Sequence, residues 1–173
     1  LRAKSAAILR IKQNFRAILT FLLPVRKSFA EAHPIAASNK KGNIKGDIFG
    51  SPDGLWFDPN GALWIQTDVS TSVLGTGDYA SMGNNQMLVA DVATGDIRRF
   101  MTGPKGCEIT GVITTPDMRS MFVNIQHPGE TPSERGDPAN TKAVGAWPDG
   151  PTGGRPRSGT IVIRKTDGGM IGT

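Results

Sequence analysis

Two acidic residues, Asp53 and Glu108, occupy nearly the same place in two similar stretches of this sequence. Asp53 stands in "SPDGLWF" and Glu108 in "GCEITGV", each close to the start of a predicted strand. Carboxylate oxygens are the ligands that a hard cation such as calcium requires. The pair therefore predicts a shared cation site, provided that the two strands lie side by side. A turn cap or a solvated charge is the alternative for each acid.

Other side chains with chemical potential stand on the predicted loops. Arg155 and Arg157, in "GGRPRS", are candidates for gripping a phosphate, or else belong to a polar loop surface. Cys107 is either a soft metal ligand or, as we favour, a small buried apolar residue. His127 is a candidate for acid–base work, although capping or solvent exposure is the more common role. Further oxygen donors on loops are Asp68, Asp78, Asn84, Asn85 and Glu130.

Short strands paired in hairpins must position these residues. The segments from Gly54 to Phe57 and from Ala62 to Thr67 flank "DPNG", which predicts a hairpin with a type I turn and a bulge. A second pair follows, with "QMLVADV" and "DIRRFMTG" on either side of "ATG". Apolar residues fall on both faces of these strands, so both faces must be covered. The tryptophans are accordingly predicted to pack between sheets.

The same plan recurs further along the chain. "GVITTPDMRSMFVNI" from Gly111 matches "GLWFDPNGALWIQT" from Gly54, and "TIVIRKTDGGMIG" matches "MLVADVATGDIRR". Two copies of a four-stranded unit predict an all-β fold, a partial β-propeller of about two four-stranded blades. The units differ mainly in the loops 68–85 and 127–158. Two blades do not close a ring, so we expect exposed apolar faces.

Residues 1–41 differ from the rest of the chain. Residues 1–32 are predicted to be a basic amphipathic helix and are followed by a polar linker. The net charge of +5 comes from this end, so it does not indicate a nucleic-acid partner. The longest apolar run, "AILTFLLPV", is too short for a membrane span.

The first residues also bear on completeness. The segment loosely resembles a secretory signal, but Arg26 and Lys27 stand between its apolar run and the candidate cleavage site, so a stray or out-of-frame segment is preferred. The chain begins at Leu1 and its first methionine is Met82. We therefore expect a fragment of a longer chain or the product of a broken reading frame.

Several motifs, taken in order, resemble the C-terminal part of PhoX-type alkaline phosphatases. They are "GNIKGDIFGSPDGLWFD", "GDYASMGNNQML", "TGPKGCEITGV", "MFVNIQHPGETPSE" and "GGRPRSGTIVI". The resemblance covers about residues 42–173, and residues 1–41 lie outside it. No GxSxG, HExxH or GxxxxGK[ST] motif is present, so a serine hydrolase, a zincin and a nucleotide-binding enzyme find no support.

The resemblance implies a phosphatase that acts on phosphate monoesters with calcium and iron as cofactors. It also implies a six-bladed propeller exported to the periplasm by the twin-arginine route. By motif position, metal binding is carried to Glu108 and Asp53, and Arg155 and Arg157 become candidate catalytic residues; Cys107 is not assigned to iron. The chain as given is expected to lack a complete site and is a candidate for an inactive fragment.

Two alternatives stay open at this point. A lactonase-like propeller hydrolase also has hairpins of the "DGLWFD" type and calcium in its channel. A non-catalytic propeller fragment is the other, since residues 1–41 have no match. "GCEITG" and "NIQHPGE" favour the phosphatase.

Overall fold

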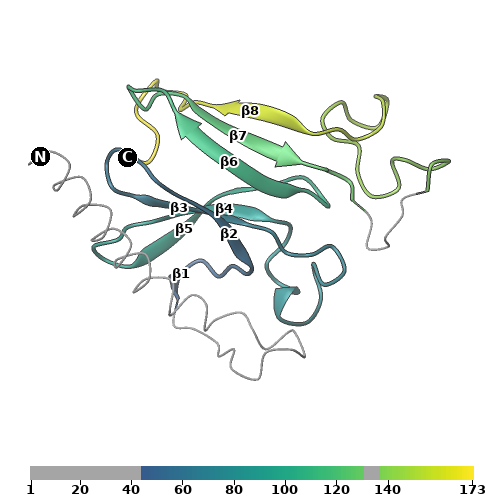
Figure 1. Ribbon diagram of the computed structural model, residues 1–173, viewed down its shortest axis with the longest axis horizontal. Coiled ribbons are helices and arrows are strands. Elements are labelled where there is room, and N and C mark those ends of the chain that lie inside the picture. The colour runs from purple at the N-terminus through teal and green to yellow at the C-terminus, as the bar shows by residue number, and fades with distance from the viewer. Residues whose placement is uncertain (1–43, 131–136) are drawn as a thin grey trace, which may run out of the picture.

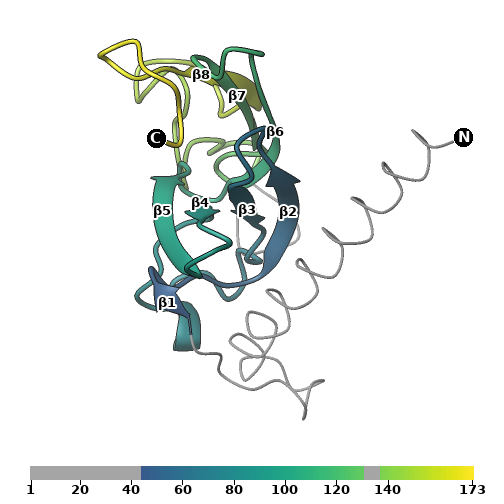
Figure 2. The same cartoon turned by 90° about the vertical axis from the view of Figure 1, so that its left-hand side faces the viewer.

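The chain folds into two β-sheets, which Figures 1 and 2 show from two directions. The computed structural model describes residues 44–130 and 137–173, so all of residues 1–41, including the predicted N-terminal helix, lie outside the described residues. The first sheet has the order β1-β5-β4-β3-β2, and the second has the order β6-β7-β8. The strands are β1 (Lys45–Gly46), β2 (Pro52–Phe57), β3 (Leu63–Thr67), β4 (Gln86–Ala90), β5 (Asp96–Thr102), β6 (Glu108–Thr114), β7 (Met121–Gln126) and β8 (Gly159–Ile163), with one short 3₁₀ helix, η1 (Gly77–Tyr79).

The predicted first hairpin is confirmed as β2 and β3. Trp56 stands opposite Trp64 in an antiparallel register. The turn between the strands closes with a hydrogen bond of 2.9 Å from the Gly61 amide to the Asp58 carbonyl oxygen. Gly61 has φ of 89°, a conformation that glycine adopts without steric cost, as the bulge that follows a type I turn requires.

The internal repeat extends to the irregularities of the strands. The register of β2 against β3 shifts between Pro52 and Leu55, and that of β6 against β7 shifts between Thr110 and Val112. Each shift contains a glycine that faces a side-chain amide of the next strand. A Cβ at Gly54 would lie 2.5 Å from the Gln66 amide oxygen, and one at Gly111 would lie 2.7 Å from the Asn124 amide nitrogen.

The two sheets pack against each other through an apolar core. Trp64 and Met87 of the first sheet meet Ile109, Val123 and Ile125 of the second, all nearly or fully buried. The other face of the first sheet has a core of its own, formed by Phe49, Leu63, Ile65, Leu88, Ala90 and Ile97. Both faces of the first sheet are therefore covered, as the two-sided apolar pattern predicted.

Trp64, the tryptophan of β3, packs in the core between the two sheets. Trp64 is fully buried and meets Phe100 edge to face, with ring centroids 4.9 Å apart. Its indole N–H donates to Oδ2 of Asp58 over 3.0 Å. The other carboxylate oxygen of Asp58 accepts the amides of Asn60 and Ala62. One aspartate thus joins the turn to the core.

The second unit has three strands rather than the predicted four. The segment after β8 does not return alongside it among the described residues. Instead Ile171 is buried in the core between the sheets, and its amide donates to the Met118 carbonyl oxygen over 2.8 Å. Gly172, with φ of 86°, lies against Trp64. Burial of Ile171 therefore draws this segment across to the first sheet.

The outer face of the second sheet carries an exposed apolar row, as expected from the sequence. Ile113 stands opposite Phe122, and Phe122 stands opposite Val162. Ile113 is 63% exposed and Val162 is 53% exposed. The number of blades in a complete ring stays a prediction. Within the described residues, no helix is long and apolar enough to cross a membrane.

Asp58 and Trp64 give a direct test of the turn-to-core link. Asp58→Asn places an amide N–H₂ against the buried indole N–H, so we expect it to lower the free energy of unfolding by about 2 kcal/mol. In a Trp64→Phe background no indole N–H remains, and Asp58→Asn should cost less than half as much. Urea denaturation of the four proteins measures this coupling; equal costs in both backgrounds would contradict the link.

Candidate functional site

Four carboxylates near the start of β6 and the end of β7 lie within electrostatic range of one another. The start of β6 and the end of β7 lie toward the right of Figure 1. Asp53 lies on β2, Asp68 follows β3, Glu108 begins β6, and Glu130 lies in the loop after β7. The carboxylate of Asp53 is the smallest of the causes that raise the pKa of Glu108, and a cation shared by the two acids stays a prediction.

Glu108 is the least exposed of these acids and is held by one oxygen. Gln126, its cross-strand partner, donates from Nε2 to Oε2 of Glu108 over 2.6 Å. Nε2 of His127 lies 3.4 Å from the same Oε2. The other oxygen, Oε1, has no hydrogen-bond partner among the described residues.

The acids disfavour one another's ionisation. Burial raises the pKa of Glu108, and the carboxylate of Asp68 raises it further, with a smaller contribution from Asp53. Burial likewise raises the pKa of Asp68, followed by repulsion from Asp53 and from Glu130. His127 opposes both shifts. The folded chain therefore holds a concentration of negative charge that a cation would offset.

His127 lies between two of the carboxylates, although no partner for it was visible in the sequence. Its Nδ1 lies 3.6 Å from Oε2 of Glu130, on the side of the ring opposite Glu108. Backbone hydrogen bonds fix Glu130 near β6, since its amide donates to the Gly106 carbonyl oxygen over 3.2 Å. Thr71, from the loop of the first unit, donates to Oε2 of Glu130 over 3.4 Å.

Asn85 is the hub that ties these segments together. Its Oδ1 accepts the Thr67 hydroxyl and the Val69 amide over 2.9 and 2.6 Å. Its Nδ2 donates to the carbonyl oxygens of Val69 and Cys107 over 3.1 and 3.0 Å. The backbone on both sides of Asp68 and just before Glu108 is thereby fixed. The amide oxygen, expected as a possible cation ligand, is instead used inside the fold.

The types of donor fit a hard cation but not a soft one. Carboxylate oxygens suit calcium. Cys107 is 1% exposed, and burial raises the pKa of its thiol to about 12. This confirms Cys107 as a buried residue. Among residues 44–130 and 137–173, no three His, Cys, Asp or Glu side chains come close enough to hold one ion together.

Neither of the two predicted arginines contacts Glu108 among the described residues. Arg155 and Arg157 are exposed on the loop between β7 and β8. Arg157 forms a two-pronged ion pair with Asp149, which raises the pKa of its guanidinium. No described contact joins either arginine to Glu108, so their catalytic role stays a prediction.

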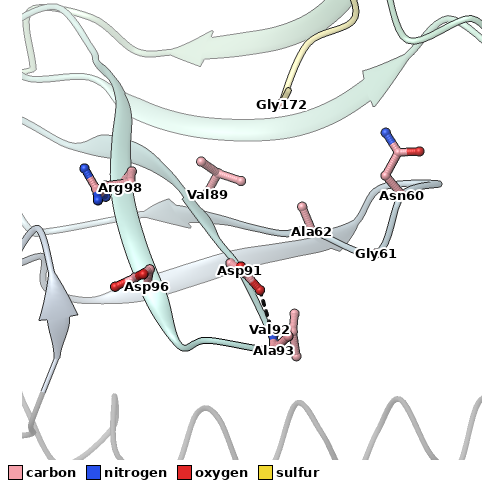
Figure 3. A pocket seen from close by; sticks show the side chains of 10 residues that line it. All are labelled: Asn60, Gly61, Ala62, Val89, Asp91, Val92, Ala93, Asp96, Arg98 and Gly172. Atoms are coloured by element: carbon pink, nitrogen blue, oxygen red, sulfur yellow. Dashed lines mark hydrogen bonds between the residues drawn. The ribbon is translucent and has the colours of Figure 1, made fainter.

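A separate groove lies at the opposite end of the first sheet (Figure 3). It has a volume of about 510 Å³ and lies between the turns 58–61 and 91–95 and Gly172. Its acids are already engaged. Asp91 accepts the amides of Ala93 and Thr94, and Asp96 pairs with Lys45 over 3.1 Å. The groove therefore competes poorly with the carboxylate group as a cation site.

The sequence alone singled out Asp53 and Glu108 and did not identify Gln126. Counting back from the turn alone would place residue 126 opposite Ile109, and the bulge at Gly111 shifts the register by one residue so that Gln126 stands opposite Glu108. The contacts of His127 with Glu108 and Glu130 depend on how the loop folds back after β7, which no periodicity encodes.

Comparisons with known proteins give two matches. The family model described as alkaline phosphatase PhoX matches residues 4–129. Among solved structures, the chain is similar to Pseudomonas fluorescens PhoX in complex with vanadate, a transition state analogue, with 46% sequence identity and a TM-score of 0.65. That similarity covers 79% of this chain and 22% of the other, so the chain spans about a fifth of that protein's length. No curated protein matches.

The matched range bears on the predicted domain boundary. It begins at residue 4, so it includes most of residues 1–41, which the sequence analysis placed outside the resemblance to the family. It ends before residue 130. The boundary between residues 41 and 42 stays a prediction.

Asn85→Ala tests the hub. The substitution leaves the Val69 amide, two carbonyl oxygens and a hydroxyl without their buried partner, so we expect unfolding free energy to fall by about 3 kcal/mol. Urea denaturation measures the loss, with Asn140→Ala, at an exposed loop position, as the control. A loss no larger than that of the control would show that water replaces the amide.

Asp68→Asn tests the repulsion between the acids. Because the pKa of Asp68 is raised in the folded state, its ionisation costs stability above that pKa, and the cost disappears as the pH falls to its ordinary value of 3.8. We therefore expect Asp68→Asn to raise the melting temperature at pH 7, with a difference that closes as the pH approaches 4. Thermal melts across this range without calcium measure it; a lower melting temperature at pH 7 would contradict the repulsion.

Proposed function

Because the chain belongs to the alkaline phosphatase PhoX family, we propose that it supplies part of a metal-dependent site for the hydrolysis of phosphate monoesters. The observation that carries the proposal is the group of mutually repelling carboxylates at the start of β6. Such a group is costly without a cation and suits one that binds oxygen.

Within this proposal Glu108 and Asp53 are candidate cation ligands, and further ligands would come from parts of the protein that the structure does not describe, since no three of the described His, Cys, Asp or Glu side chains lie close enough to hold one ion. A bound calcium ion would supply positive charge to phosphate oxygens and offset the charge that develops on them. Gln126 and His127 orient Glu108 from one side. Among the described residues Arg157 is paired with Asp149, so Arg155, exposed on the same loop, is the better candidate to meet a phosphate.

Three finer features belong to the same proposal. Calcium is the cation that the donor types favour, whereas iron would need ligands other than Cys107. The two packed sheets are adjacent blades of a propeller whose inner strands are β2 and β6. The parent protein is exported to the periplasm, where it encounters phosphate esters outside the cytoplasm.

Calcium binding by this chain tests the site. Isothermal titration calorimetry should show saturable binding, and Glu108→Gln should weaken it by about 100-fold because a ligand is lost. Asp96→Asn is the matched control, since it removes a carboxylate from the groove of Figure 3 and should leave the affinity unchanged. Calcium binding that is lost in Asp96→Asn and kept in Glu108→Gln would show that the cation site is the groove instead.

Hydrolysis of p-nitrophenyl phosphate, assayed with calcium added and with a chelator, tests the chemistry. Turnover that persists in the chelator would contradict the metal-dependent site. Lactone hydrolysis without phosphate ester hydrolysis would instead favour the lactonase-like alternative.

A further inference from the structure

Strand β8 forms an open border of the second sheet. In the order β6-β7-β8, one side of β8 pairs with β7, and none of residues 44–130 and 137–173 pairs with its other side. Figure 1 shows this border at the top of the molecule. The outward N–H and C=O groups of β8 therefore lack a strand partner among the described residues, and such an edge is a template for a further strand.

The first unit shows which kind of partner the border of β8 lacks. Its equivalent strand, β4, lies between β3 and β5, and β5 runs antiparallel to β4. In the second unit the segment after β8 crosses to the first sheet, where Ile171 is buried, so it does not take the place of β5. The partner that fits the border of β8 is therefore an antiparallel strand.

The usual devices that protect an edge strand are missing from β8. Residues 159–163 have the sequence "GTIVI", with no charged residue and no proline. The cations that follow them are engaged elsewhere: Arg164 donates from Nε to the Ser120 hydroxyl over 2.9 Å, and Nζ of Lys165 lies 3.7 Å from Oδ2 of Asp167. The strand itself therefore carries no charge that would oppose pairing.

The strand is also complementary to itself. Ile161 and Ile163 pack against the core between the sheets, and Thr160 and Val162 are exposed on the outer face. A two-fold axis perpendicular to a sheet reverses the direction of a strand and keeps its faces, so two β8 strands related by it are antiparallel. Isoleucines then lie beside isoleucines on the inner face, and β-branched neighbours of this kind stabilise antiparallel pairs.

We propose that the border of β8 is an interaction surface for a second copy of this chain, whose own β8 pairs with it in antiparallel orientation. The two three-stranded sheets then form one continuous sheet. The exposed apolar rows of the two copies meet at Val162 and form one band on its outer face. A ladder of five residues buries less area than a permanent dimer needs, so the association is reversible and depends on protein concentration.

Thr160→Lys tests the proposal, because it brings a positive charge from each copy into one short ladder. Sedimentation equilibrium of the full chain should show a monomer–dimer equilibrium for the wild type and a Kd at least about tenfold higher for the variant. Ile113→Lys is the matched control: Ile113 is exposed on the same outer face but lies on β6, away from the border, so its Kd should equal that of the wild type. Val162→Lys is the second border variant if thermal melts show that Thr160→Lys is unfolded.

Hydrogen exchange read by mass spectrometry locates the surface. The amides of residues 159–163 should exchange more slowly at high protein concentration than at low, whereas those of β6 should not change. A wild type that stays monomeric at all concentrations overturns the proposal. Equal weakening by Ile113→Lys and Thr160→Lys also overturns it, since the copies would then meet through their outer faces. So does slow exchange of residues 159–163 at every concentration, because another segment of the same chain would then cover the border.

Discussion

The arrangement of this protein's acids depends on one buried amide. Asn85 is 2% exposed and uses both donors and its acceptor to bind backbone groups before β6 and on the loop after β3, together with the Thr67 hydroxyl. A buried polar group of this kind is stable only when all its bonds are made, so the two sheets and the loop must come together in one arrangement. Asp68 and Glu108 are the residues next to those fixed points.

Strand β6 carries a residue of the apolar core directly beside an acid. Ile109 is buried between the sheets, whereas Glu108, one residue earlier, is kept at the rim beside other acids. Packing of the sheets holds the carboxylates together although their mutual repulsion raises the pKa of Asp68 and of Glu108. Raised pKa values of this kind occur both at functional sites and in structural charge networks.

Local chemistry made part of this molecule predictable. The β2–β3 hairpin follows from "DPNG", and the two-sided core follows from the placement of Trp64 between Leu63 and Ile65. The short strand β1 and the missing fourth strand of the second unit could not be predicted, because both depend on distant partners: β1 pairs with β5 in parallel, and Ile171 reaches a core made by other strands. The same limit hid Gln126, whose importance appears only once Glu108 stands opposite it.

The glycines at the two strand irregularities connect this fold to its history. Gln66 fits over Gly54 because glycine has no Cβ, and Asn124 stands in the same relation to Gly111. The pairs occupy equivalent places in the two units, as expected if one ancestral segment was duplicated. Within each unit, divergence at the glycine and at its amide is then coupled: a larger residue in place of the glycine requires the facing amide to move or shorten.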